Sequence, residues 1–152
     1  MNNTKSLWSS IVKVIFVVNY TNLDELAKLR ESIKTVGLNI HECVILCNVS
    51  KRKEKGLLPE HNSVVFLNEN EIKLFGRIKN VKASKLFSRN FDLLLVIDDF
   101  QKKIEKQLTK LNAKMKVGVN TENVNLDIRL NSKSKNQLHL LEFVKGTLEK
   151  IN

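Results

Sequence analysis

The stretch NFDLLLVIDDFQKKIEKQLTKLNAKMKVGV, residues 90–119, decides the fold class of this chain. Its residues 93–97 are apolar on both faces of an expected strand, which is typical of a central strand in a parallel sheet. Residues 101–112 then carry apolar side chains at helical spacing, and a further apolar strand ends near Gly118. A strand, a helix and a strand of these lengths predict a parallel βαβ unit.

The same alternation extends over the rest of the chain. Further strands are expected at residues 13–20, 39–49, 63–68, 114–119 and 123–131, and helices at residues 21–37, 69–78, 80–90 and from about 134 onward. The last of these strands alternates between apolar and polar residues, so we expect it at an edge. The chain is therefore predicted to be an α/β protein: a single-domain, Rossmann-like, mainly parallel sheet with helices on both faces, one late edge strand and a C-terminal helix.

Two helices carry local signals that a structure can test. Thr21 and Asp24 are expected to form a cap pair at the start of the first long helix. Gly37 suits the left-handed position after its end. The short helix near residues 80–90 is expected to turn three apolar residues inward: Val81, Leu86 and Phe87.

The length of 152 residues predicts one domain, residues 13–152, preceded by a short tail, residues 1–12. No apolar stretch reaches the ~18 residues of a membrane span, and no cleavage signal follows the apolar start, so we expect a cytoplasmic protein. Cys43 and Cys47 share one face of an expected strand about 13 Å apart, at ~3.3 Å per residue. This distance is too long for a disulfide, so two buried free thiols are expected.

The chain is strongly basic, with a formal net charge of +10 at pH 7. Such a charge suits a polyanionic partner such as RNA. It is equally consistent with a solvated lysine-rich face or with an AT-rich genome, since 21 of the 26 basic residues are lysine and 18 residues are asparagine. Base stacking is not expected, because the aromatic residues near these clusters, Phe75 and Phe87, resemble core residues. The residues expected to contact RNA are Lys51, Arg52, Lys53, Arg77, Lys79, Lys82, Lys102, Lys103, Lys106, Lys110, Lys114 and Lys116.

Polar residues follow the expected strands at their carboxyl ends, where α/β sheets bind ligands. The candidate ligand pocket consists of Asn19, Asn48, Asp98 and Asp99. Paired aspartates in this position can hold a divalent cation or act as a general base. The alternative, which we favour, is that Asp99 caps the helix that begins near Gln101.

The sequence predicts neither a cofactor, a metal site nor a catalytic residue. It contains neither of the glycine-rich phosphate-binding patterns, and the turn after the first strand has no glycine, so no dinucleotide or ATP is expected. Cys47 could act as a nucleophile at a strand end. However, His41, His61 and His139 form no Cys-His signature with it, and a buried structural thiol is the preferred interpretation.

Three pieces of the chain carry a resemblance to known proteins: FLNENEIKLFGRIK at residues 66–79, FDLLLVID at residues 91–98 and LNAKMKVGV at residues 111–119. They resemble an uncharacterised family of short proteins from Bacteroidetes bacteria, a domain of unknown function, with Arg77 where that family usually has lysine. The resemblance extends over most of the chain and implies a Rossmann-like fold without an assigned activity. The last two pieces are also similar to the first half of heptosyltransferase-like glycosyltransferases. Those enzymes need a second Rossmann-like domain, and the chain ends before one begins, so this similarity implies only the fold.

We therefore expect a non-catalytic binding or accessory protein that contacts RNA, most economically the ribosome, through lysine-rich faces. One alternative is an enzyme or sensor that uses a small ligand or a metal near Asp98 and Asp99. Another is a protein-interaction subunit. Salt-dependent RNA binding would separate the first function from the others, and a ligand-dependent rise in melting temperature would favour the second.

Overall fold

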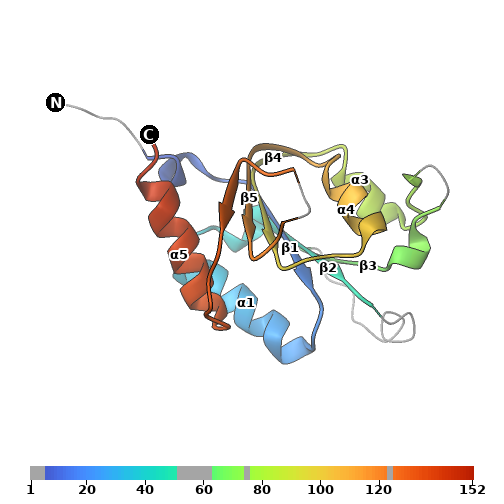
Figure 1. The fold of residues 1–152 in the computed structure, drawn as a ribbon, viewed down its shortest axis with the longest axis horizontal. Coiled ribbons are helices and arrows are strands. Elements are labelled where there is room, and N and C mark those ends of the chain that lie inside the picture. The colour runs from blue at the N-terminus through green and yellow to red at the C-terminus, as the bar shows by residue number, and fades with distance from the viewer. Residues whose placement is uncertain (1–5, 51–62, 74–75, 123–124) are drawn as a thin grey trace.

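The computed structural model describes residues 6–50, 63–73, 76–122 and 125–152. These residues form a six-stranded sheet with the strand order β3-β2-β1-β4-β5-β6, and every neighbouring pair of strands is parallel. Helices α1 and α5 cover one face of the sheet, whereas α3 and α4 cover the other (Figure 1). The predicted Rossmann-like α/β fold is confirmed.

A strand is present at each predicted segment, and β6 lies at an edge as its alternation indicated, although it covers only Ile128–Leu130 of the predicted residues 123–131. The strands are β1 (Val14–Asn19), β2 (Cys43–Asn48), β3 (Val64–Leu67), β4 (Asn90–Ile97), β5 (Asn112–Val119) and β6 (Ile128–Leu130). The helices described are α1 (Leu23–Thr35), α3 (Val81–Leu86), α4 (Lys102–Leu108) and α5 (Gln137–Glu149).

The apolar run in β4 supplies both layers of the core. Leu93 and Leu95 pack in the cluster that faces α1 and α5, whereas Leu94 and Val96 pack in the cluster that faces α3 and α4. This burial on both faces explains why the run shows no alternation of apolar and polar residues. The chain direction across the sheet reverses between β1 and β4, so the carboxyl ends of these two strands form the switch point where such folds bind ligands.

Helix α1 begins with a different cap from the one predicted. The Oδ1 atom of Asn22 accepts the Glu25 backbone N–H at 2.8 Å, so the cap is Asn22 and not the pair of Thr21 and Asp24. Asparagine is as good a cap as threonine or better, and it stands one residue closer to the helix. Gly37 has φ of +91° after the helix ends, which confirms the predicted left-handed position.

Helix α3 also differs from the prediction in one residue that lines the surface described below. Asn80 caps the helix by accepting the Ala83 backbone N–H at 3.2 Å. This cap places Val81 in the first turn, where it is 66% exposed and does not face inward. Ala83 and Leu86 are buried, and Phe87 is only partly buried.

The segment expected to be helical near residues 69–78 is largely a short hairpin. A 3-10 turn at Glu69–Glu71 is followed by an antiparallel bridge between Ile72 and Ile78. Gly76 has φ of +76°, a conformation that ends a helix, and its N–H donates to the Lys73 carbonyl at 3.0 Å. Gln107 of α4 fixes this turn, because its Nε2 donates to the Gly76 carbonyl at 2.9 Å.

The described part of the segment expected as a tail packs against the end of the chain. The Leu7 backbone N–H donates to the Ile151 carbonyl at 2.6 Å, and Ile11 is 8% exposed. The first described residues and the C-terminus therefore lie on the same side of the molecule, near α5 (Figure 1).

Candidate functional site

The carboxyl ends of β1 and β2 carry amide side chains that bond to one another. Asn48 is 5% exposed, and its Nδ2 donates to Asn19 Oδ1 and to Gln101 Oε1, both at 2.9 Å. Asn19 Nδ2 in turn donates to the Asp99 carbonyl at 3.0 Å. The two asparagines of the predicted ligand pocket therefore tie β1 and β2 to the connection between β4 and α4. One buried atom of the cluster, Asn48 Oδ1, has no hydrogen-bond partner among the described residues.

Asp99 does not cap α4, which corrects the favoured interpretation. Its Oδ1 accepts the Thr121 hydroxyl at 3.0 Å and the Glu122 backbone N–H at 3.3 Å. The N-cap position of α4 is Gln101, which makes no side-chain cap bond because its Oε1 accepts from Asn48. Asp99 thus joins the ends of β4 and β5.

Asp98 has a conformational role at the end of β4. Its φ is +69°, and its backbone N–H donates to the Val119 carbonyl at 2.9 Å. Asn120 occupies the equivalent position after β5 with φ of +56°. Aspartate and asparagine enter this left-handed region more readily than other residues with a side chain, which accounts for both residue types without any catalytic role. Burial, followed by the Asp99 charge, raises the pKa of the Asp98 carboxyl.

The two cysteines are buried free thiols, as predicted. Burial raises the pKa of Cys47 to about 12, and burial together with the Glu42 charge raises that of Cys43 to about 12. A thiol with such a pKa carries almost no thiolate at neutral pH, which argues against the nucleophile considered for Cys47. No group of three or more His, Cys, Asp or Glu side chains in the described ranges could hold a metal ion.

The amino edge of the sheet contains a structural carboxylate that the sequence analysis missed. Asp92 Oδ2 accepts the backbone N–H groups of Val12 at 2.9 Å and Lys13 at 2.8 Å. Its Oδ1 lies 3.5 Å from Lys114 Nζ. The hydrogen bond from the Lys13 backbone is the main reason why the pKa of Asp92 is lowered. Only the partners, 79 and 80 residues away in the chain, reveal this role.

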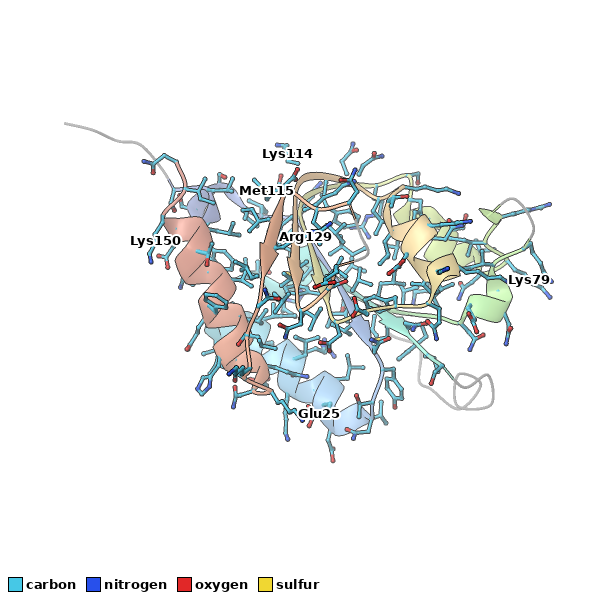
Figure 2. All side chains as sticks on the ribbon, in the orientation of Figure 1. Glu25, Lys79, Lys114, Met115, Arg129 and Lys150 are labelled. Atoms are coloured by element: carbon cyan, nitrogen blue, oxygen red, sulfur yellow. The ribbon has the colours of Figure 1, made fainter. Side chains whose placement is uncertain are left out.

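A basic surface lies on the other side of the molecule, where the hairpin meets α3 and α4. Two adjoining hollows of about 1070 Å³ and 600 Å³ share Lys73, Gly76, Gln107 and Lys110 in their linings. We call the surface of both hollows the basic groove. Lys79 of the groove and Lys150, the residue after α5, lie on opposite sides of the molecule (Figure 2). The cationic residues of the basic groove are Lys73, Arg77, Lys79, Lys85, Lys103, Lys106 and Lys110.

The charge of the basic groove is not neutralised by the described part of the chain. No acidic side chain is among the described residues that line the two hollows. The ion pairs found between described residues lie elsewhere, two of them along α1 and one between Lys114 and Asp92. All seven cationic residues of the groove are exposed. Such a surface attracts anions over a distance of roughly a Debye length.

The structure brings together five of the twelve residues expected to contact RNA: Arg77, Lys79, Lys103, Lys106 and Lys110. Lys82 and Lys102 are exposed on α3 and α4 but do not line the basic groove. Lys114 and Lys116 lie in β5, away from it. Lys51, Arg52 and Lys53 fall outside the described residues, as does Phe75.

Sequence reasoning missed two groove residues, Lys73 and Lys85. Lys85 belongs to the same basic cluster as Arg77, so its place in the chain was a usable signal. Lys73 could not be placed, because the hairpin brings it to the groove, through its N–H bond to the Arg77 carbonyl (2.6 Å) and the Gly76 N–H bond to its own carbonyl (3.0 Å). Phe87 was expected in the core, yet it also lines the groove.

Three observations bear on the class of protein, one from the described helices and two from comparisons with known proteins. None of the helices described is long and apolar enough to cross a membrane. None of the curated proteins matches the sequence. A family model described as a family of unknown function, DUF6913, matches residues 1–151, and the chain belongs to that family.

Proposed function

We propose that the protein binds RNA non-catalytically through the basic groove, by contact of its lysines with backbone phosphates. The observation that supports this proposal is the set of seven exposed cations around two adjoining hollows, with no acidic side chain among the described residues of their linings. Six of the seven are lysines, which act as point charges and suit phosphate contacts that do not depend on base sequence. An RNA partner also favours the cytoplasmic location.

The carboxyl edge of the sheet gives less support to the alternative of a small-ligand enzyme or sensor. Asn19, Asn48 and Asp99 are engaged with one another or with neighbouring loops, and among the atoms of these side chains only Asn48 Oδ1 is buried without a partner in the described part of the chain. Polar groups that already have partners within the fold gain less from a ligand, since each new bond replaces an existing one. Within the described part of the chain, the cations of the basic groove have no carboxylate partners to lose.

The proposal is tested by fluorescence anisotropy with a labelled unstructured RNA at several salt concentrations. For a single strand, the slope of log K against log salt is about −0.7 per phosphate neutralised, so seven contacts set a limit of about −5. The triple variant Lys73→Ala, Lys85→Ala, Lys110→Ala should lower the slope by about 2 and weaken binding at least about tenfold.

A matched control removes the same charge from the opposite side of the molecule: Lys28→Ala, Lys34→Ala, Lys150→Ala. Lys28 and Lys34 lie on α1, and Lys150 follows α5. This variant should retain the slope within experimental error. Equal losses in both triple variants would assign binding to net charge and not to the groove. Polyglutamate that competes with RNA at equal charge would instead identify an acidic protein as the partner.

The narrower proposal is that the RNA belongs to the ribosome. Co-sedimentation with ribosomal particles at low and at high salt tests it. The protein should migrate with a particle at low salt and return to the top of the gradient at high salt, and the groove variant should stay at the top in both. A wild-type protein that stays at the top throughout, while still binding free RNA, would limit the proposal to other RNA.

A further inference from the structure

The larger hollow of the basic groove is lined in part by apolar side chains, which contacts with phosphates alone would leave uncovered. Ile78, Val81 and Phe87 line the larger hollow together with the lysines. Val81 is 66% exposed, more than any other large hydrophobic residue described as exposed. Its position results from the Asn80 cap, which starts α3 with Val81 facing outward. An exposed apolar patch enclosed by cations is unfavourable in water and is typical of a binding surface.

The apolar side chains of the groove distinguish between duplex and single-stranded RNA. A duplex stacks its bases inside the helix and offers a protein mainly phosphates and sugar hydroxyls, which would leave Val81 and Phe87 uncovered. A single strand exposes the flat faces of its bases, and these stack on aromatic and apolar side chains. Resting on the proposed function, we propose that the basic groove takes single-stranded RNA, with its bases against Val81 and Phe87 and its phosphates against the surrounding lysines.

The dimensions of α3 agree with this ligand. Val81 begins α3 and Phe87 follows its last residue, so the two are six residues apart, which is about 9 Å along the axis at 1.5 Å per residue. Bases stacked at about 3.4 Å per step would place two or three nucleotides along that length. The hollow of about 1070 Å³ slightly exceeds the ~300–1,000 Å³ range of small-molecule pockets, which leaves room for a short stretch of strand.

The neutral polar residues that line the groove predict that RNA affinity depends only weakly on base sequence. Gln107, the amide side chain that could read a base edge, already donates its Nε2 to the Gly76 carbonyl. Among the described residues that line the larger hollow, the other neutral polar side chains are Ser84 and Ser88, and serine pairs with any base. Discrimination between strands should therefore come from stacking strength and not from base-edge hydrogen bonds.

The test compares a labelled single-stranded RNA with a duplex of the same length at one fixed salt concentration, by anisotropy. The single strand should bind at least about tenfold more tightly, since stacking contributes about 1–3 kcal/mol per base. Phe87→Leu keeps an apolar side chain but removes the aromatic face. It should weaken single-strand binding about fivefold, leave duplex binding within twofold and leave the salt slope unchanged.

Two further variants control for unfolding and for general effects of surface substitutions. Val81→Ser changes a side chain that is 66% exposed, so the fold should tolerate it, and it should also reduce the preference for single strands. Phe143→Leu changes an aromatic residue that is 42% exposed on α5 and should change nothing.

Two outcomes would overturn the inference: a duplex that binds as tightly as the single strand, or single-strand affinity that survives both Phe87→Leu and Val81→Ser. Failure of the proposed function looks different. In that case neither form of RNA binds with a salt slope, and the triple lysine variant has no effect.

Discussion

The carboxyl edge of the sheet and the basic groove differ in how the fold uses their polar groups. At the carboxyl edge, Asn19, Asn48 and Asp99 bond within the protein and stabilise connections between strands, and Asn48 Oδ1 is the one atom of these side chains that is buried without a partner among the described residues. In the groove, seven cations surround hollows without a carboxylate among the described residues of the lining. Proximity to the switch point of an α/β sheet does not by itself identify a binding site; polar groups left available by the fold are the better guide.

The largest effect on stability that this comparison predicts is at Asn48. The variant Asn48→Ala removes two hydrogen bonds from a nearly buried amide and should lower the free energy of unfolding by about 2–3 kcal/mol. Urea unfolding measures the loss, with the exposed Asn131→Ala as a control. RNA affinity per folded molecule should stay within twofold. A variant that keeps its stability but loses RNA binding would break the comparison, because it would make the carboxyl edge the binding site.

The amino edge offers a second structural carboxylate whose effect depends on pH. Asp92 has a lowered pKa in the folded protein, so its stabilising contribution is present above the unfolded value of about 3.9 and is lost as pH falls through the folded pKa. Asp92→Asn should lower stability by about 1–2 kcal/mol at pH 7, because it loses a charge-assisted acceptor of two backbone N–H groups.

Urea unfolding of the wild type and of Asp92→Asn between pH 7 and pH 3 checks this expectation. The difference between the two proteins should shrink below about pH 4, as the carboxylate of the wild type becomes protonated. Glu142→Gln, an exposed change on α5, serves as the control for pH-dependent effects of net charge. A difference that is constant over this pH range would mean that Asp92 acts through its shape and not through its charge.

The sequence contained the signals for the fold but not for most of the site. The apolar run in β4 and Gly37 after α1 act through local backbone and burial preferences, which a single sequence displays. The hairpin before α3 was missed because its turn depends on Gln107, which lies 31 residues from Gly76. The partners of Asp99, 22 and 23 residues away, were equally hidden. Contacts of this kind are set by the tertiary structure, so no local pattern predicts them.

The sequence predicts only part of the basic groove, because tertiary contacts decide the rest of it. A run of basic residues shows that charge is present, and residues 77–85 showed it clearly. It does not show which cations are neutralised, and the ion pair between Lys114 and Asp92 joins residues 22 positions apart. Nor does it show that Val81 faces outward, which depends on the Asn80 cap.

The smallest effect we predict is at Asp98, and it has the opposite sign to that at Asp92. Burial and the Asp99 charge raise the pKa of Asp98, so its ionised form is unfavourable in the folded protein above that pKa, and the penalty disappears as pH falls below about 3.9. Asparagine tolerates the φ of +69° equally well and carries no charge. Asp98→Asn should therefore stabilise the protein at pH 7, by no more than about 0.5 kcal/mol.

Thermal unfolding at pH 7 and pH 3.5 measures this gain, which should be present at the higher pH and absent at the lower. RNA binding should be unchanged or slightly stronger, because one negative charge is lost far from any contact that the groove requires. A clear loss of stability, or a loss of a ligand-dependent rise in melting temperature, would show that the Asp98 carboxylate has a partner that favours its charged form. The carboxyl edge would then hold a ligand site, and the contrast between its mostly bonded polar groups and the available cations of the basic groove would fail at Asp98.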